Sequence, residues 1–315
     1  MEAMQFPTRI NSLAWSPDNR QIAAACADGT VYVRDTKVPE VEHPISLSGH
    51  AGEALSVTWS PDGKRIASGG TDHRVQIWNA ETGGGISTPL KFDDEVSKVQ
   101  WAPHGRRFLV VAGKRVWVMQ EEVKRQSARP QSSSAWAIRG DPTARLSQAI
   151  LGHSSLVVDA EWSPDGEYIA TASSNLTIQI WDAIEQEWVL SLGEAMGVVR
   201  LKWAPDGLRV AVGTNQGKIY IYRPAGGQLM EQYHVSNAPV RDLSWIESQR
   251  ALSSNAVIAG QQMKVVGQQT DAVSLQEPKA DRVLAFSSDG TFLAARSQNR
   301  VVHIYPCSQI EPRVS

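Results

Sequence analysis

The chain has 315 residues, a formal net charge of -2, 42% hydrophobic residues and 20% charged residues. This balance excludes a disordered chain and gives no electrostatic reason to expect nucleic acid as a direct partner. No apolar run is long enough to cross a membrane, and the first residues lack the basic and apolar regions of a secretory signal. Cys26 and Cys307 cannot form a disulfide framework, which predicts the cytoplasm, or also the nucleus in a eukaryote.

One aromatic residue recurs along almost the whole chain. The recurring positions, at steps of 44, 42, 61, 41, 42 and 41 residues, are Trp15, Trp59, Trp101, Trp162, Trp203, Trp245 and Phe286. Most of them precede a turn such as SPDG at 60–63 or APDG at 204–207. Pro presets φ, Asp bonds the local backbone and Gly accepts a positive φ, so a tight turn between two strands is predicted. Apolar and polar residues alternate before the aromatic, which is the period of a strand.

The segments between these turns complete a four-stranded unit. In the second repeat LSVTW, RIASGG and VQIW are predicted strands, and a fourth strand fits before the next cycle. Such a unit cannot bury its two faces alone, so radial stacking of the units is expected. The predicted fold is all-β, a single seven-bladed β-propeller over residues 1–315. Its blades are expected to begin near residues 10, 53, 96, 155, 197, 239 and 281.

Two stretches, WSPDGKRIASGGTDHRVQIWN at 59–79 and WSPDGEYIATASSNLTIQIWD at 162–182, resemble the WD-repeat (WD40-type) family. The resemblance extends over about residues 10 to 305, and it is weakest in the third repeat and in the sixth, at 245–266. It implies that the N-terminal segment, Ala3 to Pro7, closes the ring as the outer strand of the last blade. It also implies buried hydrogen-bonded tetrads, which would make the second and fourth blades the most rigid. The tetrad positions are His50, Ser68, Asp72 and Trp78 in the second blade, and His153, Thr171 and Trp181 in the fourth, where Asn175 replaces the Asp.

No catalytic arrangement is apparent. The chain has no G-x-S-x-G, no P-loop, no H-E-x-x-H and no C-x-x-C, and no histidine or cysteine spacing suggests a zinc site. We therefore predict a protein that is not an enzyme and that needs no cofactor, metal or small-molecule substrate. A hydrolase is the alternative, because SPDGKRIA also resembles propellers of the TolB and prolyl-oligopeptidase families. The closing Trp78-Asn79 and Trp181-Asp182 favour the WD-repeat family over these.

The resemblance implies a docking platform that binds one or more proteins or peptides, without a membrane, in a multiprotein complex. The alternative is a sensor or regulatory subunit that switches a partner enzyme. The family's contact positions carry over to the top face at Arg9, Glu53, Glu95, Arg241 and Arg282, and to Leu156 and Val158 in the fourth blade. The arginines would form a basic arc for an acidic or phosphorylated peptide and the glutamates an acidic arc. Alternatively, these charges form an ordinary solvated rim.

A long insertion is predicted after the third blade, at about residues 120–150. Long loops in compact folds tend to be functional or disordered. Trp136 and Arg139 are the candidate contact residues within it, since Trp is unusual in a solvated loop. Trp136 would either fold back onto the blade wall or anchor in a pocket of a partner.

Overall fold

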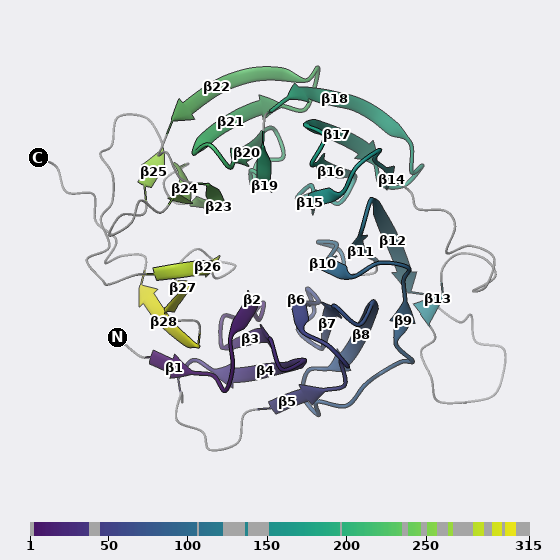
Figure 1. The fold of residues 1–315 in the computed structure, drawn as a ribbon, viewed down its shortest axis with the longest axis vertical. Helices are drawn as coiled ribbons and strands as arrows, with labels where there is room; N and C mark the ends of the chain where they lie inside the picture. Colours follow the sequence, from purple (N-terminus) through teal and green to yellow (C-terminus); the bar gives the residue numbers. More distant parts are fainter. Residues whose placement is uncertain are drawn as a thin grey trace, which may run out of the picture. The chain divides into compact units, whose positions relative to one another are not determined.

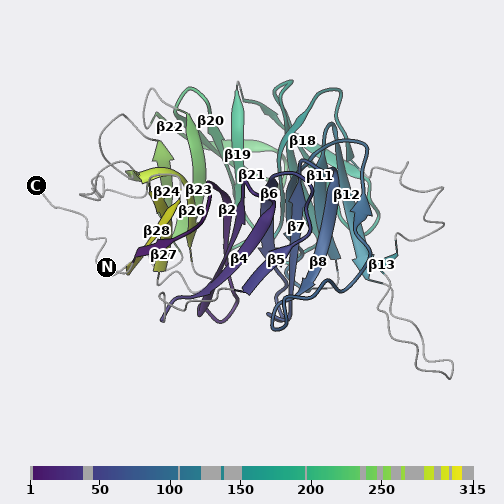
Figure 2. The same ribbon diagram turned by 60° about the horizontal axis from the view of Figure 1, so that its bottom comes forward.

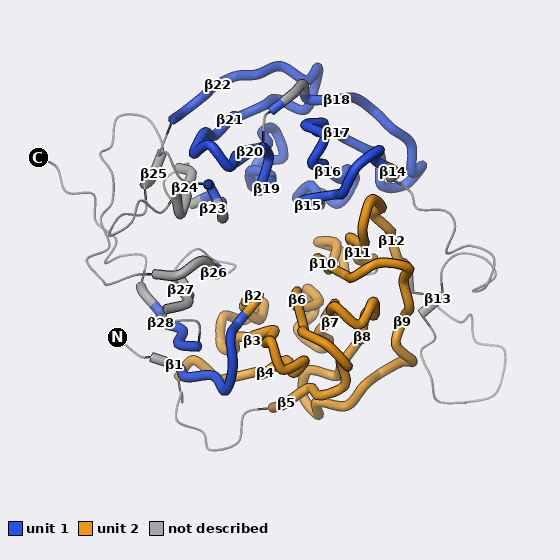
Figure 3. Tube along the Cα trace, in the orientation of Figure 1, with its two compact units in different colours: residues 1–10, 153–315 blue, residues 11–152 orange. Residues whose placement is uncertain are grey.

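The computed structural model describes residues 3–37, 45–105, 107–121, 136–137, 151–195, 197–234, 239–246, 251–256, 264–266, 280–286, 292–297 and 300–306. Within these residues the regular elements are all β-strands, and no helix there is long and apolar enough to span a membrane. The chain divides into two compact units, residues 11–152 and residues 1–10 with 153–315, which are described separately (Figure 3).

Three antiparallel sheets follow one another from Ile10 to Gly152, and we call them blades one to three (Figure 1). Blade one contains β2 (Ile10–Trp15), β3 (Gln21–Cys26), β4 (Thr30–Asp35) and β5 (Ile45–Ser48). Blade two contains β6 (Ala54–Trp59), β7 (Arg65–Gly70), β8 (Arg74–Asn79) and β9 (Leu90–Lys91). Blade three contains β10 (Val96–Trp101), β11 (Arg107–Ala112) and β12 (Arg115–Glu121), with β13 (Trp136–Ala137) and β14 (Leu151–Gly152) both paired to β12.

The described strands of the other unit form four more antiparallel sheets, blades four to seven. Blade four contains β15 (Val157–Trp162), β16 (Tyr168–Ser173), β17 (Thr177–Asp182) and β18 (Trp188–Glu194). Blade five contains β19 (Val198–Trp203), β20 (Val210–Thr214), β21 (Lys218–Arg223) and β22 (Gln228–His234). Blade six contains β23 (Val240–Ile246), β24 (Ala251–Ala256) and β25 (Lys264–Val266), and blade seven contains β26 (Ala280–Phe286), β27 (Phe292–Ser297) and β28 (Val301–Pro306).

Blade seven gains its fourth strand from the other end of the chain. Strand β1 (Ala3–Gln5) pairs antiparallel with β28, and the register sets Met4 opposite Val302. The Met4 side chain is fully buried, so this N-terminal strand packs as part of the sheet. The segment expected to supply an outer strand therefore does so, within its own unit.

The recurrent turn is built as the sequence indicates. In blade two the Ser60 hydroxyl donates to Asp62 Oδ1 at 2.5 Å, and the Lys64 amide donates to the same oxygen at 3.0 Å. Gly63 has a φ of 69°, a conformation that costs glycine little and other residues more. The turn returns the chain so that Trp59 lies opposite Ile66 in the β6–β7 pair.

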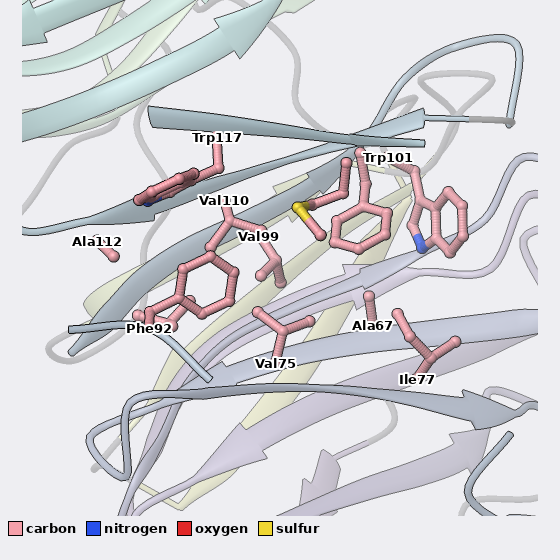
Figure 4. Close-up of a cluster of buried hydrophobic side chains, with 12 residues drawn as sticks. Ala67, Val75, Ile77, Phe92, Val99, Trp101, Val110, Ala112 and Trp117 are labelled. Atoms are coloured by element: carbon pink, nitrogen blue, oxygen red, sulfur yellow. The ribbon is translucent and has the colours of Figure 1, made fainter. Parts of the chain in front are cut away.

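The core lies between neighbouring sheets. One cluster, drawn in Figure 4, joins β7 and β8 of blade two to the strands of blade three through residues such as Ala67, Val75 and Ile77. Phe92 and Trp117 meet edge to face in this cluster, with ring centroids 5.8 Å apart. Since neither face of a single blade is covered by its own strands, this packing between sheets supplies the burial that each repeat needs.

Two of the recurring tryptophans also bond the preceding blade. Trp59 Nε1 donates to the Ala14 carbonyl of blade one at 3.1 Å, and Trp245 Nε1 donates to the Lys202 carbonyl of blade five at 3.2 Å. A buried indole N–H usually needs such a partner. At Trp59 and Trp245 the recurring aromatic therefore links two blades as well as filling a packing position.

These observations confirm the predicted all-β fold of repeated, mostly four-stranded antiparallel sheets. The strands of a blade run side by side along their length (Figure 2). We call the end of a blade at which its first strand begins the top. The bottom is the opposite end, where the first strand ends in the aromatic and its turn.

Candidate functional site

The most complete polar network lies at the top of blade two. His50 Nδ1 is 2.9 Å from Asp72 Oδ1, and His50 Nε2 is 2.8 Å from Ser68 Oγ. Trp78 Nε1 donates to the same Ser68 Oγ at 2.9 Å. The side chains of His50 and Asp72 are 0% and 5% exposed, so the network is shielded from water.

The donors in this network can be assigned from the chemistry of its members. An indole N–H only donates, so Ser68 Oγ accepts from Trp78 and gives its own hydrogen to His50 Nε2. The proton of His50 then sits on Nδ1 and is donated to Asp72. The second oxygen of Asp72 accepts the Ala51 amide at 3.1 Å. Four side chains thereby tie the loop before β6 to strands β7 and β8, which is a structural role.

Blade four repeats this arrangement with a different closing group. His153 Nε2 is 2.8 Å from Thr171 Oγ1, which also accepts Trp181 Nε1 at 3.0 Å. The other ring nitrogen of His153 meets Thr177 Oγ1 at 3.1 Å. Thr177 in turn donates to Asn175 Oδ1 at 2.8 Å. Asn175, which stands in the Asp position, is therefore linked to His153 through the Thr177 hydroxyl. Burial lowers the pKa of His153 below its ordinary value.

Two buried carboxylates, which the sequence reasoning missed, join blade four to blade five. Asp159 Oδ2 accepts the Leu201 amide at 2.8 Å, and Glu161 Oε2 accepts the Trp203 amide at 2.9 Å. The other oxygen of Glu161 is paired with Lys202. These partners are backbone amides and an ammonium group, so the two acids bind strand β19 rather than forming a general acid–base pair.

A signal for these carboxylates exists in the repeat. Asp159 lies three residues before the recurring Trp162, and Ser56 lies three residues before Trp59. Ser56 Oγ accepts the Val99 amide of blade three at 3.1 Å, which is the same type of contact. A polar residue three positions before the recurring tryptophan therefore indicates a hydrogen bond to the first strand of the next blade.

The predicted acidic positions lie at the top of blades two and three, whose first strands pack together. Glu53 is half-buried and accepts the Asn11 amide group at 3.1 Å. Glu95 is exposed. Its neighbour Asp93 is 3.5 Å from Arg115, an exposed pair that contributes little stability but offsets the local negative charge.

The structure describes the side chains of some, but not all, of the predicted contact residues in the other unit. Arg9 is exposed just before β2. Arg241 and Arg282 lie in strands β23 and β26, and their side chains fall outside the described part of the chain. Leu156 and Val158, at the top of blade four, are 57% and 37% exposed.

The insertion is described at its margins. Strand β13 sets Trp136 opposite Glu121 and Ala137 opposite Gln120. The side chain of Trp136, all of Arg139 and the rest of the insertion lie outside the described residues. The choice between folding back and anchoring in a partner therefore stays a hypothesis. Among the residues that the structure describes, no group of three or more His, Cys, Asp or Glu is placed to hold a metal ion.

Comparison with known families and proteins agrees with this geometry. The family model for the WD domain, G-beta repeat, matches residues 4–35, 42–79 and 144–182. The model for the anaphase-promoting complex subunit 4 WD40 domain matches residues 188–248. The two models describe WD40 repeats in both compact units.

Three curated proteins illustrate the similarity. Protein HIR1 of Cryptococcus neoformans is 28% identical over 194 residues, which are 58% of this chain and 22% of that protein. WD repeat-containing protein slp1 of Schizosaccharomyces pombe is 25% identical over 183 residues, 58% of this chain and 34% of slp1. B-type cell cycle switch protein ccs52A of Medicago truncatula is 25% identical over 201 residues, 55% of this chain and 42% of ccs52A. The chain thus spans less than half of each relative.

Proposed function

Because this chain belongs to the WD-repeat family, we propose that it is a non-catalytic protein-interaction subunit that docks partner proteins in a multiprotein complex. We further propose that its blades form one seven-bladed propeller closed by the N-terminal strand. The described sheets and the pairing of β1 with β28 support the closed form. Rigid blades with loops at both ends suit docking, because little conformational entropy is lost when a preformed surface binds.

The observation that carries the proposal is a pair of exposed apolar side chains, Leu156 and Val158, at the top of blade four. Leu156 and Val158 alternate with buried Val157, so both side chains point away from the core. The Leu156 carbonyl accepts the Ser174 amide at 2.9 Å and the Ser173 hydroxyl at 3.0 Å. Exposed apolar side chains on a backbone held in this way are typical of a binding surface.

The charged residues at the tops of the blades are proposed to bind charged segments of partner proteins. Arg9, Arg241 and Arg282 would bind acidic or phosphorylated segments, because a guanidinium group holds a carboxylate or phosphate with two parallel hydrogen bonds. Glu53 and Glu95 would bind basic segments. The localisation we propose is the cytoplasm, or also the nucleus in a eukaryote.

A second candidate function is that of a regulatory subunit which binds a peptide or protein and switches a partner enzyme. It is favoured by the name of one relative, the cell cycle switch protein ccs52A. Measuring the activity of a captured enzyme with and without this chain separates the two functions. A docking subunit leaves the turnover of a saturated enzyme unchanged, whereas a switch changes it.

The test of the docking function is affinity capture of the tagged chain from its source cells with quantitative mass spectrometry. We expect a stoichiometric partner whose recovery falls at least tenfold in the double variant Leu156→Asp, Val158→Asp. The matched control is Lys64→Asp, which changes the net charge by the same two units at an exposed position at the bottom of blade two. Equal recovery with all variants, or the absence of any stoichiometric partner, would contradict the proposal. Arg241→Glu with Arg282→Glu tests the basic positions in the same way.

A further inference from the structure

Large exposed apolar side chains are unevenly distributed over the described residues. All of those with more than a third of their surface exposed lie in blades four and five: Leu156, Val158, Ile184, Trp188, Val189, Leu208, Leu229 and Met230. Two of these belong to the top of blade four, discussed above. The other six lie in the bottom turns and outer strands β18 and β22. Single exposed apolar residues are common, but a group of six on neighbouring blades marks a candidate interaction surface.

Two residues of this bottom group, Leu208 and Met230, line a shallow cavity of about 350 Å³ in blade five. Leu208, from the turn after Trp203, and Met230, from β22, form apolar walls together with Pro224 and Ala225. Leu208 is 67% exposed and Met230 is 39% exposed, so the cavity opens to solvent. Its size suits one leucine-sized side chain with part of the backbone that carries it.

The charged residues that line the cavity carry a net positive charge. Asp206 Oδ2 accepts two hydrogen bonds from Arg209, at 2.7 and 3.0 Å, and the Arg209 guanidinium lies 4.7 Å from the centre of the Trp245 ring. This pair is neutral and already held in place. Arg223, at the end of β21, lines the same cavity, is exposed, and has no ion-pair partner among the described residues. An anionic group on a ligand would therefore be attracted to Arg223.

The strand beside the cavity has an open edge. In the described residues β22 pairs with β21 on one side and with no strand on the other. It has seven residues, compared with four in β5 and two in β9, the outer strands of blades one and two. A free strand edge presents unpaired N–H and C=O groups that can pair with an extended peptide.

The register of β22 directs one side chain out of the ladder. Leu229 pairs with Tyr222 and Glu231 with Ile221, so Met230 lies in the irregularity between them, and it lines the cavity. The apolar surface continues onto blade four, because the turn before β22 abuts β18. A Cβ atom added to Gly227 would lie 3.0 Å from the carbonyl oxygen of Ser191, in the middle of β18.

We propose that blade five binds an extended peptide of a partner protein as an additional strand along β22. A leucine-sized side chain of that peptide fills the cavity against Leu208 and Met230, and a nearby carboxylate pairs with Arg223. The cavity supplies specificity for the apolar residue, the guanidinium selects the acid, and the strand edge supplies backbone hydrogen bonds. This site is separate from the proposed docking surface at the top of blade four.

A second copy of the chain fits this edge less well than such a peptide. Symmetric antiparallel pairing of two β22 strands about their central residue would set Glu231 opposite Glu231. Like charges directly opposite each other destabilise a strand pair. The acidic, apolar peptide instead complements both the cavity and Arg223, which has no ion-pair partner in the part of the chain that the structure describes.

The test uses synthetic ten-residue peptides on the full chain, with binding measured by fluorescence anisotropy. Each peptide carries one leucine and one aspartate, one to four positions apart, in a frame of serine, threonine and valine. Matched peptides replace the leucine by serine or the aspartate by asparagine. We expect at least one spacing to bind tenfold more tightly than both of its matched peptides. N-methylation of alternate backbone amides should abolish the binding of that peptide for one of the two alternating sets only.

Variants of the chain locate the site. Arg223→Glu and Met230→Asp should each weaken binding of the selected peptide at least tenfold, while near-UV circular dichroism stays that of the parent. Lys64→Glu, an exposed cation at the bottom of blade two, and Val158→Asp, at the top of blade four, should leave the affinity unchanged. Since Val158→Asp tests the other surface, failure of either proposal is distinguishable from failure of the other.

Three results would overturn the inference. The first is a peptide set without any tenfold preference for leucine with aspartate. The second is a selected peptide that binds Arg223→Glu as well as it binds the parent chain. The third is a dimer of the chain, seen by sedimentation velocity and lost in Arg223→Glu, which would assign the edge to a second copy.

Discussion

Blade two and blade four share a sequence pattern and a strand arrangement, yet their buried polar networks end differently. In blade two the ring of His50 is held between a hydroxyl and the carboxylate of Asp72. In blade four the ring of His153 is held between two hydroxyls, those of Thr171 and Thr177. The histidine, the hydroxyl on the second strand and the tryptophan on the third are geometrically alike in both blades.

The difference shows that the repeat conserves a geometry rather than a set of charges. A buried histidine needs an acceptor for its Nδ1 proton, and either a carboxylate or a hydroxyl can serve. The carboxylate makes the stronger, charge-assisted hydrogen bond. In blade four, burial disfavours the protonated imidazole and lowers the pKa of His153 below its ordinary value.

The largest expected effect is one that the two blades share. Ile66 and Ile169 occupy the same position on the second strand, opposite Trp78 and Trp181, and both are fully buried. Each change to alanine should cost about 2–5 kcal/mol of unfolding free energy, because it leaves a cavity in the core. Urea unfolding followed by tryptophan fluorescence measures both. Costs that differ more than twofold would show that the hydrophobic parts of the blades also differ.

The next prediction is a loss of stability that should differ between blade two and blade four. Asp72→Ala removes the partner of His50 Nδ1 and of the Ala51 amide, and should cost about 2 kcal/mol because buried donors lose their acceptor. Asn175→Ala, at the matching position of blade four, should cost no more than about 0.5 kcal/mol because the residue is exposed and does not contact His153. Thr177→Val, which removes the true partner of His153, is the control for blade four. Equal costs for Asp72→Ala and Asn175→Ala would refute the assignment.

A pH dependence should appear in blade four. The folded pKa of His153 lies below its ordinary value of 6.5, so on acidification the unfolded chain takes up the proton first. Stability should therefore fall as the pH drops from about 6.5 towards the folded pKa, by at most about 1.4 kcal/mol per pH unit, and should not change above 6.5 on account of this group. Replacing His153 by glutamine should remove this slope. His234→Gln, at an exposed histidine, should leave it, and an unchanged slope in both variants would exclude His153 as its source.

The smallest expected effect concerns the bottom of blade two. Arg65 lies 4.8 Å above the centre of the Trp101 ring of blade three and 3.4 Å from Asp62, whereas blade four has Tyr168 at this position. Arg65→Met should cost about 0.5–1 kcal/mol through loss of the cation–π contact. Lys64→Met, at the exposed neighbouring position, is the control in the same urea unfolding experiment. A cost within error of the control would mean that the contact adds nothing measurable.

Much of the fold could be predicted from the sequence because its signals are local. Alternation before the recurring aromatic and the turn after it depend on neighbours within a few residues, and Trp59 with Ser60 to Gly63 forms the predicted unit. The resemblance to WD repeats then places His50, Ser68, Asp72 and Trp78, which the structure brings into one hydrogen-bonded chain.

Other features depend on residues that are distant in the chain. The role of Thr177 depends on which atom comes within reach of a histidine 24 residues away. The contact of Asp159 with the Leu201 amide spans 42 residues. The cavity beside Met230 forms only because two turns of blade five converge at one end of the blade. For the partner of His153 and for the cavity, no pattern of spacing or polarity indicates the contact, whereas the repeat position of Asp159 gives a signal for its contact.

Local signals in the sequence specify the repeated unit of this protein: strand, turn, strand and closing aromatic, with the hydrophobic alternation that gives each sheet two distinct faces. These are properties of short segments, whose φ and ψ preferences and side-chain period decide the outcome. Packing between strands and blades sets which acceptor closes each histidine network and which apolar side chains stay exposed around Arg223. Those outcomes depend on how sheets pack together, because burial and hydrogen-bond partners are set by whatever lies opposite a residue in space.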